Sequence, residues 1–266
     1  MPGILLRIPY IQNKVSEVAT TQLSGHLGVP VKIGNVDIEW FNRLVLEGLY
    51  LEDQDGKVMF EANHVAAGFE IMPLLEGKFV FTTVRLFGFS FNLRKHTPES
   101  PLNLQFVIDA FASKDSIKKE KNIDLRFNSI MIRRGNFSYN VDSEKETPGK
   151  FNAKHIDIKN LSAKISLKAF NKDSVNAHIK KMSFDEASGF SLNKLSLNVV
   201  GNRDSAFVQD FEVRLPQTNL KIGRARIDLS EIDSLPALLN NAPIDLNITP
   251  SQICLKDLSP FVPAFK

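Results

Sequence analysis

The stretch that decides the fold is MIRRGNFSYNV, residues 131–141, in which apolar and polar residues alternate on both sides of Gly135. Alternation with a period of two places successive side chains on opposite faces of a β-strand. Gly135 is expected to let the chain bend or bulge where two such phrases meet. We interpret the preceding Arg133 and Arg134 either as solvated side chains at a turn or as contacts to a lipid phosphate.

The same phrase recurs along the chain: apolar-x-apolar, a break, then apolar-x-apolar. It is found in VRLFGFSFNL, IDIKNLSAKISL, MSFDEASGFSLNKLSLNV and FEVRLPQTNLKIGRARIDL. The spacing of the phrases is irregular, which excludes a tight solenoid period. We therefore predict a mainly β fold over residues 30–266, with an elongated, curved antiparallel sheet built as a meander of hairpins.

Three segments depart from the strand pattern. Residues 1–29 contain apolar residues at helical spacing, and Gly28 and Pro30 are expected to end this helix. An amphipathic helix here either packs against the end of the sheet or lies at a membrane surface. Short helical interruptions are predicted near residues 101–113 and 231–240. The apolar residues of the first helix are Ile11, Val15, Val18, Leu23 and Leu27.

Composition limits the classes of function. The 266 residues are 43% hydrophobic and 24% charged, which is typical of a globular chain. The net charge of +3 comes from interleaved basic and acidic residues, so no nucleic-acid partner is expected. The single cysteine, Cys254, can form no internal disulfide bond. The five histidines lack metal-ligand spacing and no catalytic motif is present, so we expect no enzyme, no metal and no cofactor.

An apolar sheet face must be covered. Two packed sheets, a closed barrel or an open trough filled by a ligand all satisfy this requirement, and the periodicity does not choose among them. If the sheet forms a trough, the alternating apolar side chains line it. The candidate lining residues are Val36, Ile38, Trp40, Leu44, Leu46, Phe79, Phe81, Phe87, Phe89, Phe91, Ile130, Ile132, Phe137, Tyr139, Ile156, Ile158, Ile165 and Leu167.

The beginning of the chain contains a series of motifs in a fixed order: a P-x-hydrophobic-Q phrase at residues 9–12, an amphipathic helix, V-x-I-G-x-V at residues 31–36, and L-x-L-x-D at residues 49–53. In this order the motifs resemble the TamB/AsmA-like family of Gram-negative bacteria, in the form found in the Bacteroidota. Similarity extends to LNLQFVIDAF and to the final LKDLSPFVPAF.

The resemblance implies a specific biological setting. Members of the family have one inner-membrane helix and a long periplasmic trough with an apolar lining, similar to bridge proteins that move lipids between membranes. This chain then corresponds to the first periplasmic part of such a protein, taken from a longer sequence. The implied partners are phospholipid acyl chains, the inner membrane through a missing N-terminal helix, and a TamA-like outer-membrane barrel through a missing C-terminal part.

Three functions remain open at this point. The first is a lipid-conducting trough that serves inner-to-outer membrane phospholipid transport and outer-membrane biogenesis. The second is a chaperone or scaffold of outer-membrane protein assembly that receives client strands at its sheet edges. The third is a plain β-sandwich interaction module whose core is filled by its own side chains.

Overall fold

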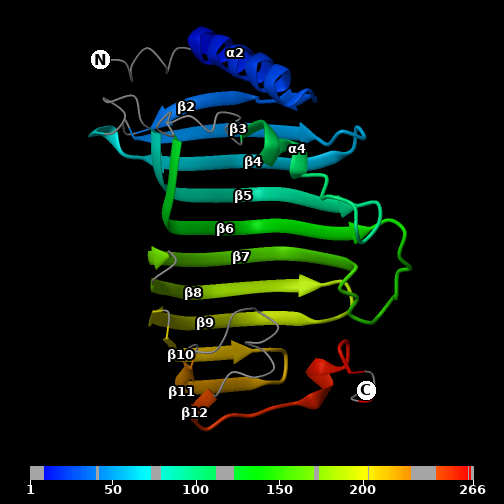
Figure 1. Ribbon diagram of the computed structural model, residues 1–266, viewed down its shortest axis with the longest axis vertical. Coiled ribbons are helices and arrows are strands. Elements are labelled where there is room, and N and C mark those ends of the chain that lie inside the picture. Colours follow the sequence, from blue (N-terminus) through cyan, green and yellow to red (C-terminus); the bar gives the residue numbers. More distant parts are fainter. Residues whose placement is uncertain are drawn as a thin grey trace. The chain divides into compact units, whose positions relative to one another are not determined.

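The computed structural model describes residues 9–39, 42–72, 79–111, 123–170, 174–202, 204–228, 244–262 and 264. Its strands form one 12-stranded open sheet, mostly antiparallel, in the order β1-β3-β4-β5-β6-β7-β8-β9-β10-β11-β12, with β2 also paired to β3 (Figure 1). This architecture confirms the predicted mainly β fold. The strands are β1 (Val31–Lys32), β2 (Asn35–Glu39), β3 (Arg43–Glu52), β4 (Val58–Phe69), β5 (Phe79–Lys95), β6 (Ile123–Val141), β7 (His155–Phe170), β8 (Ser174–Glu186), β9 (Ser191–Asn202), β10 (Ser205–Arg214), β11 (Asn219–Asp228) and β12 (Ile244–Ile248).

Three helical elements accompany the sheet: α2 (Pro9–Leu27), α4 (Gln105–Phe111) and the 3₁₀ turn η1 (Leu255–Leu258). Helix α2 ends as the sequence predicts, because Gly28 has a positive φ of 70° and its N–H donates to the carbonyl of Ser24 at 2.8 Å. Helix α4 lies inside the interruption predicted near residues 101–113. The interruption predicted near residues 231–240 falls outside the described residues.

The repeated phrase does not always correspond to a hairpin. VRLFGFSFNL, IMIRRGNFSYNV and IDIKNLSAKISL each lie within a single long strand, β5, β6 and β7 respectively, whereas the last two phrases span the turns between β8 and β9 and between β10 and β11. The break in the first three phrases is therefore a mid-strand irregularity. After a break of this kind, the apolar residues of the strand occupy the alternate set of positions.

Residues in the left-handed region mark these breaks. Positive φ values of 52–61° occur in mid-strand in β3, β5, β6, β7 and β10. At each one the apolar alternation shifts by one position, as from Leu46 to Leu49 in β3. Such a residue interrupts the regular pleat, and at Gly48 and Gly88 it does so without a change in the register with β4. The residues are Gly48, Gly88, Arg134, Asn160 and Asp210.

Strand β3 demonstrates the effect of the shift. Leu44 and Leu46 precede Gly48, and Leu49 and Leu51 follow it. All four leucines nevertheless pack against one buried cluster in and between β1 and β2, formed by Val31, Ile33 and Val36. Without the irregularity, side chains three positions apart would point to opposite faces. The shift therefore keeps the apolar side chains of one strand on one face of the sheet.

In β6 the irregular backbone lies one residue before Gly135, where the bend was predicted. The positive φ belongs to Arg134 and not to Gly135. Gly135 is buried, and a Cβ at this position would collide with the ring of Phe89. Gly135 is thus required for the close approach of an aromatic ring and not for a bend.

The chain forms two compact units. The first comprises Met1–Phe127, Ile132–Thr147 and Asn152–Asn160, and the second comprises Asn128–Met131, Pro148–Phe151 and Leu161–Lys266. In the first unit, α2 packs on the sheet through Leu23 and Leu27, which contact the buried cluster of Val31, Ile33 and Val36. In the second unit, the segment after β12 is tied to β11 by a pair of backbone hydrogen bonds between Asn219 and Gln252, at 2.8 and 2.9 Å.

Substitution of Gly135 by alanine is expected to destabilise the protein by about 1–3 kcal/mol, because the new methyl group overpacks the contact with Phe89. Urea or thermal unfolding measures the change. Gly25→Ala, in helix α2 with no atom close to the added Cβ, is the matched control and should leave stability unchanged or slightly higher. Phe89→Leu combined with Gly135→Ala should recover part of the loss, and additive effects of the two changes would contradict the proposed contact.

Candidate functional site: the apolar face of the sheet

In the first unit, the apolar face is formed by side chains that lie opposite one another on neighbouring strands. Directly paired residues of antiparallel strands point to the same side of the sheet. Phe60 lies 6.2 Å from Phe89 and 5.7 Å from Phe91, and Phe91 lies 6.2 Å from Phe137, measured between ring centroids. Two rows cross the strands here: Leu51, Phe60 and Phe91, and Leu49, Ala62 and Phe89.

In the second unit, the register produces equivalent apolar rows. One row consists of Ala177, Val199, Val208, Ala225 and Leu246, and another of Met182, Leu195, Val213 and Leu220. The row next to the first carries polar side chains on the opposite face: His178, Asn198, Gln209, Arg224 and Asn247. The sheet therefore separates an apolar face from a polar face in this unit also.

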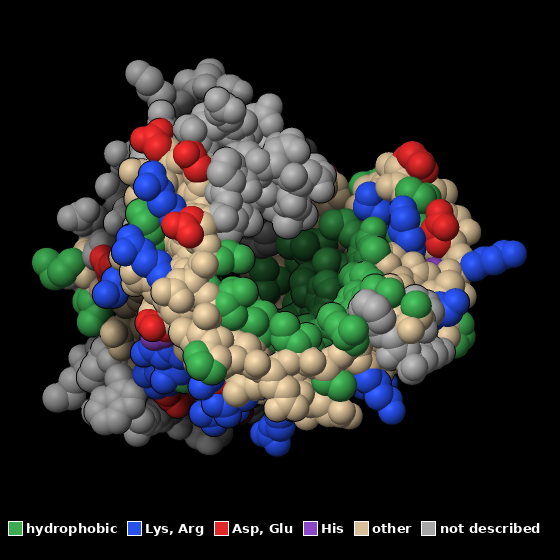
Figure 2. Space-filling model, turned by 90° about the horizontal axis from the view of Figure 1, so that it is seen from below, with side chains coloured by type: hydrophobic (Ala, Val, Ile, Leu, Met, Phe, Trp, Pro, Cys, Tyr) green, Lys and Arg blue, Asp and Glu red, His purple; other side chains and the backbone are tan. Residues whose placement is uncertain are grey.

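Side chains of the apolar face are mostly neither buried nor fully exposed. Among the described residues, Met59 and Val141 are the largest fully buried side chains, and valines and alanines make up most of the other buried apolar positions. A core filled by its own side chains would bury its large residues completely. Figure 2 shows the result as a hollow in which hydrophobic side chains gather, with Lys and Arg side chains outside it.

The predicted lining residues divide into three groups. Val36 and Phe89 are buried, at 6% exposure each. Trp40 lies outside the described residues, and the side chains of Phe79 and Phe81 are not among those described. The remaining predicted residues are partly exposed: Ile38, Leu44, Leu46, Phe87, Phe91, Ile130, Ile132, Phe137, Tyr139, Ile156, Ile158, Ile165 and Leu167.

Phe87 departs from the expectation that it lines the same surface as Phe89 and Phe91. Its ring packs edge-on against His64 at 5.6 Å, and the guanidinium of Arg133 lies 5.9 Å from the ring centroid. Arg133 directly follows the candidate lining residue Ile132, so their side chains point to opposite faces. The positive φ of Gly88 separates Phe87 from Phe89 and explains why simple alternation misplaced it.

The helix residues divide similarly. Leu23 and Leu27 pack against the cluster that includes Val36, while Leu44 and Leu46 contact the same cluster from β3. At this end of the sheet the apolar face is therefore covered by α2 and forms a core. The side chains of Ile11, Val15 and Val18 lie outside the described part of the chain.

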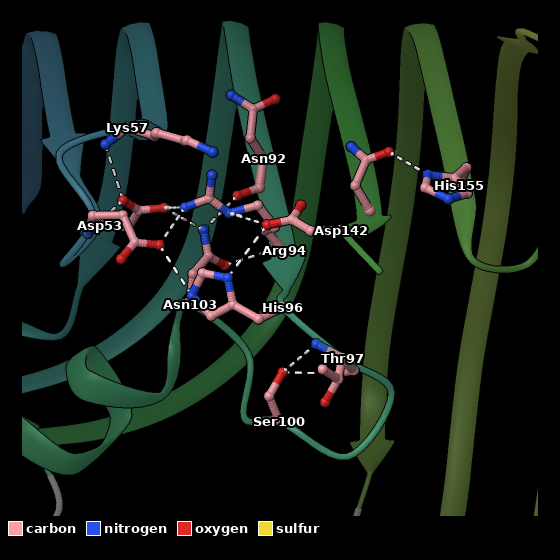
Figure 3. A network of polar contacts seen from close by, with 12 residues as sticks. Asp53, Lys57, Asn92, Arg94, His96, Thr97, Ser100, Asn103, Asp142 and His155 are labelled. Atoms are coloured by element: carbon pink, nitrogen blue, oxygen red, sulfur yellow. Dashed lines mark hydrogen bonds and ion pairs between the residues drawn. The ribbon is translucent and has the colours of Figure 1, made fainter. Parts of the chain in front are cut away.

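A polar network at the strand ends fixes the loop that leads to α4 (Figure 3). Asp53, at the turn after β3, is 2% exposed and accepts hydrogen bonds from Arg94 at 2.9 Å and from the amide of Asn103 at 3.0 Å. The N–H of Asn103 donates to the carbonyl of Arg94, and the N–H of Arg94 donates to Oδ1 of Asn103. Arg94 and Asn103, which both bind Asp53, are also hydrogen-bonded to each other, so the loop is fixed to the end of β5.

The same network contains His96, which lies between two carboxylates. Its Nε2 is 3.2 Å from Asp55, and its Nδ1 is 3.3 Å from Asp142, the residue that follows β6. Beyond the loop, the carbonyl of Ala110 in α4 accepts a hydrogen bond from Nε2 of His26 in α2 at 2.9 Å. The loop and α4 thus connect the end of β5 to helix α2.

Burial opposes ionisation of Asp53, but the hydrogen bonds from Asn103 and from the N–H of Lys57, together with the charge of Arg94, hold the pKa of Asp53 below its ordinary value. Glu212 has a lowered pKa for related reasons, chiefly the hydrogen bond from Lys194, with Arg214 on its other side. No group of three His, Cys, Asp or Glu side chains suited to a metal ion occurs among the described residues.

Comparisons with known proteins add no family assignment. No family model matches the chain, and a search of curated proteins finds no similar sequence. None of the helices in the described ranges combines the length and hydropathy needed to cross a membrane.

Replacement of Asp53 by asparagine should lower stability at pH 7 by about 2 kcal/mol, the scale of a charge-assisted hydrogen bond. A lowered pKa stabilises the fold above the ordinary value near 3.8 and loses that contribution as the pH falls through the folded-state pKa. The difference between Asp53→Asn and the parent should therefore shrink below about pH 4. Unfolding measured from pH 2 to 8 checks this, with the exposed Asp204→Asn as control; a pH-independent difference would refute the linkage.

Proposed function

We propose that the apolar face shelters lipid acyl chains, so that the chain serves as a non-enzymatic segment of a lipid-transfer protein of the TamB/AsmA-like type. In this proposal the protein acts in the periplasm, anchored to the inner membrane, and passes phospholipid toward the outer membrane. One observation carries the proposal: long strands keep their apolar side chains on one face through mid-strand shifts, yet most of these side chains remain partly exposed.

The energetics of the apolar face favour an apolar ligand. Apolar surface in water costs about 25 cal/mol per Å², and transfer of each CH₂ group of an acyl chain from water is worth about 0.8 kcal/mol. Contact between an acyl chain and the apolar face of the sheet removes the surfaces of both from water. Large exposed apolar surfaces in water-soluble domains commonly mark binding sites.

The two ends of the first unit's sheet would have different roles in this proposal. Where α2 covers the cluster of Val31, Ile33 and Val36, no space for a ligand is expected, because the side chains are already buried. The acyl chains would instead contact the surface from β4 onward, where Phe91 and Phe137 are partly exposed. Helix α2 would then close the site at the β1 and β2 end.

A second candidate, strand addition by a client protein, is supported by β12. Strand β12 is the last in the sheet order and pairs with β11; no described strand pairs with its other edge. Extended peptides add to edges of this kind through backbone hydrogen bonds. This function predicts binding of strand-forming peptides to the lipid-free protein, with no requirement for the apolar face.

A pair of neighbouring residues in β7 tests the lipid proposal. Ile165 is partly exposed on the apolar face and Lys164 is exposed on the other face. Ile165→Asp should reduce bound lipid about tenfold, because losing contact with about two CH₂ groups costs about 1.6 kcal/mol. Lys164→Asp is the matched control and should retain the lipid.

Native mass spectrometry with lipid extraction, on protein purified from a Gram-negative host, measures the bound phospholipid. Thermal unfolding of both variants should stay close to that of the parent protein, because Ile165 is not part of a filled core. A lipid-free parent protein, or equal lipid in both variants, would contradict the proposal. Phe89→Asp is unsuitable for this purpose, since Phe89 is buried and its loss is expected to unfold the protein.

A further inference from the structure

The polar face of the second unit carries two arginines that share one aromatic ring. Arg224 and Arg226 lie two positions apart in β11, so their side chains point to the same side. Their guanidinium carbons lie 4.7 and 5.9 Å from the ring centroid of Phe207 in β10. Phe207 lies directly opposite Arg226 in the strand register. Cation–π attraction to one ring holds both guanidinium groups in place.

The positive charge of this pair is not neutralised by an ion pair within the described residues. Other arginines have such partners: Arg43 lies 3.1 Å from Glu39, and Arg214 lies 2.5 Å from Glu212. Two like charges held over the same ring repel each other, and an anion between them would remove that repulsion.

The arginine pair opens onto a cavity of about 810 Å³, which is also lined by residues of β12. Asn247, directly opposite Arg224 in the strand register, contributes an amide. Leu246 and Ile248 also border the cavity, but their side chains point to the opposite face, where Leu246 lies opposite Ala225. Asp245 also lines the cavity and supplies one negative charge, which leaves a net charge of +1 from its ionised groups. The cavity therefore combines two guanidinium groups, an amide and a net positive charge.

We propose that Arg224 and Arg226 form a binding site for a phosphate group. Guanidinium groups are planar donors whose paired N–H groups match the oxygens of a phosphate, and two of them can contact one phosphate from two sides. The ligand chemistry is the phosphate group itself, supplied either by free phosphate or by a lipid headgroup. The phosphate site stands independently of the acyl-chain function, because the two arginines lie on the face opposite the apolar rows.

Titration followed by NMR or calorimetry tests the site with two ligands, inorganic phosphate and dihexanoyl phosphatidylglycerol kept below its micelle concentration. The variant Arg224→Gln/Arg226→Gln should lose at least about tenfold in affinity for both ligands, because charge-assisted hydrogen bonds are removed. Lys221→Gln removes one positive charge from an exposed position of the same strand, outside the cavity, and should change the affinity by less than about twofold. Added salt should weaken binding to the parent protein.

Two further variants test which face of the sheet binds the anion. Asp245→Asn should strengthen binding of both ligands, because it removes the negative charge directly opposite Arg226. Leu246→Ser/Ile248→Ser changes side chains of the opposite face and should leave the affinity for inorganic phosphate unchanged. If the parent protein binds inorganic phosphate and does not prefer the lipid, the phosphate site is supported and the lipid headgroup is excluded as its source.

The proposal is overturned if neither ligand binds, if the double arginine variant binds as well as the parent protein, or if Lys221→Gln causes an equal loss. Circular dichroism and thermal unfolding should show that the arginine variant is folded, since both side chains are exposed. Ile165→Asp should still bind inorganic phosphate, so a failure of the acyl-chain function and a failure of the phosphate site give different results.

Discussion

The period of two along a β-strand is the constraint on which this structure depends. A slip of one residue turns every following side chain to the opposite face, which would place apolar residues in water and charged residues on the apolar face. Strands of 10 to 19 residues, such as β3 and β6, must avoid that outcome over their whole length. The left-handed residues in mid-strand reset the alternation, and the sequence changes its apolar phase at the same positions.

Much of the fold could be predicted from local sequence patterns. Alternation identified the strands, and helical spacing followed by Gly28 identified α2 and its end. The position of the mid-strand shift in β6 was harder to predict. Glycine is the residue type that suggests an irregular backbone, but Arg134, and not Gly135, has the positive φ. Gly135 is needed because the ring of Phe89 leaves no room for a side chain there, and this contact joins residues far apart in the sequence. The same shift at Gly88 explains why Phe87 faces His64 and Arg133.

The features of the candidate site that depend on distant contacts could not be predicted. In the sequence, Asp53 has the features of an ordinary turn residue. It is nevertheless buried, because Arg94 and Asn103, about forty and fifty positions later, donate hydrogen bonds to its side chain. Periodicity also gives the same apolar pattern for a filled core and for an open surface. The structure contains both: side chains under α2 are packed by the helix, while most apolar side chains on the later strands are partly exposed.

The mid-strand shifts also bear on how the length of a strand can change during evolution. In a regular strand, gaining or losing one residue reverses the facing of all residues beyond that point, and such changes are rejected. At Asn160 or Asp210 the chain already contains one residue that takes no part in the alternation. Loss of that residue would leave Val208 and Phe211 in strict alternation. Single-residue insertions and deletions in related sequences should therefore collect at these positions, and the strands between them should vary in composition without varying in length.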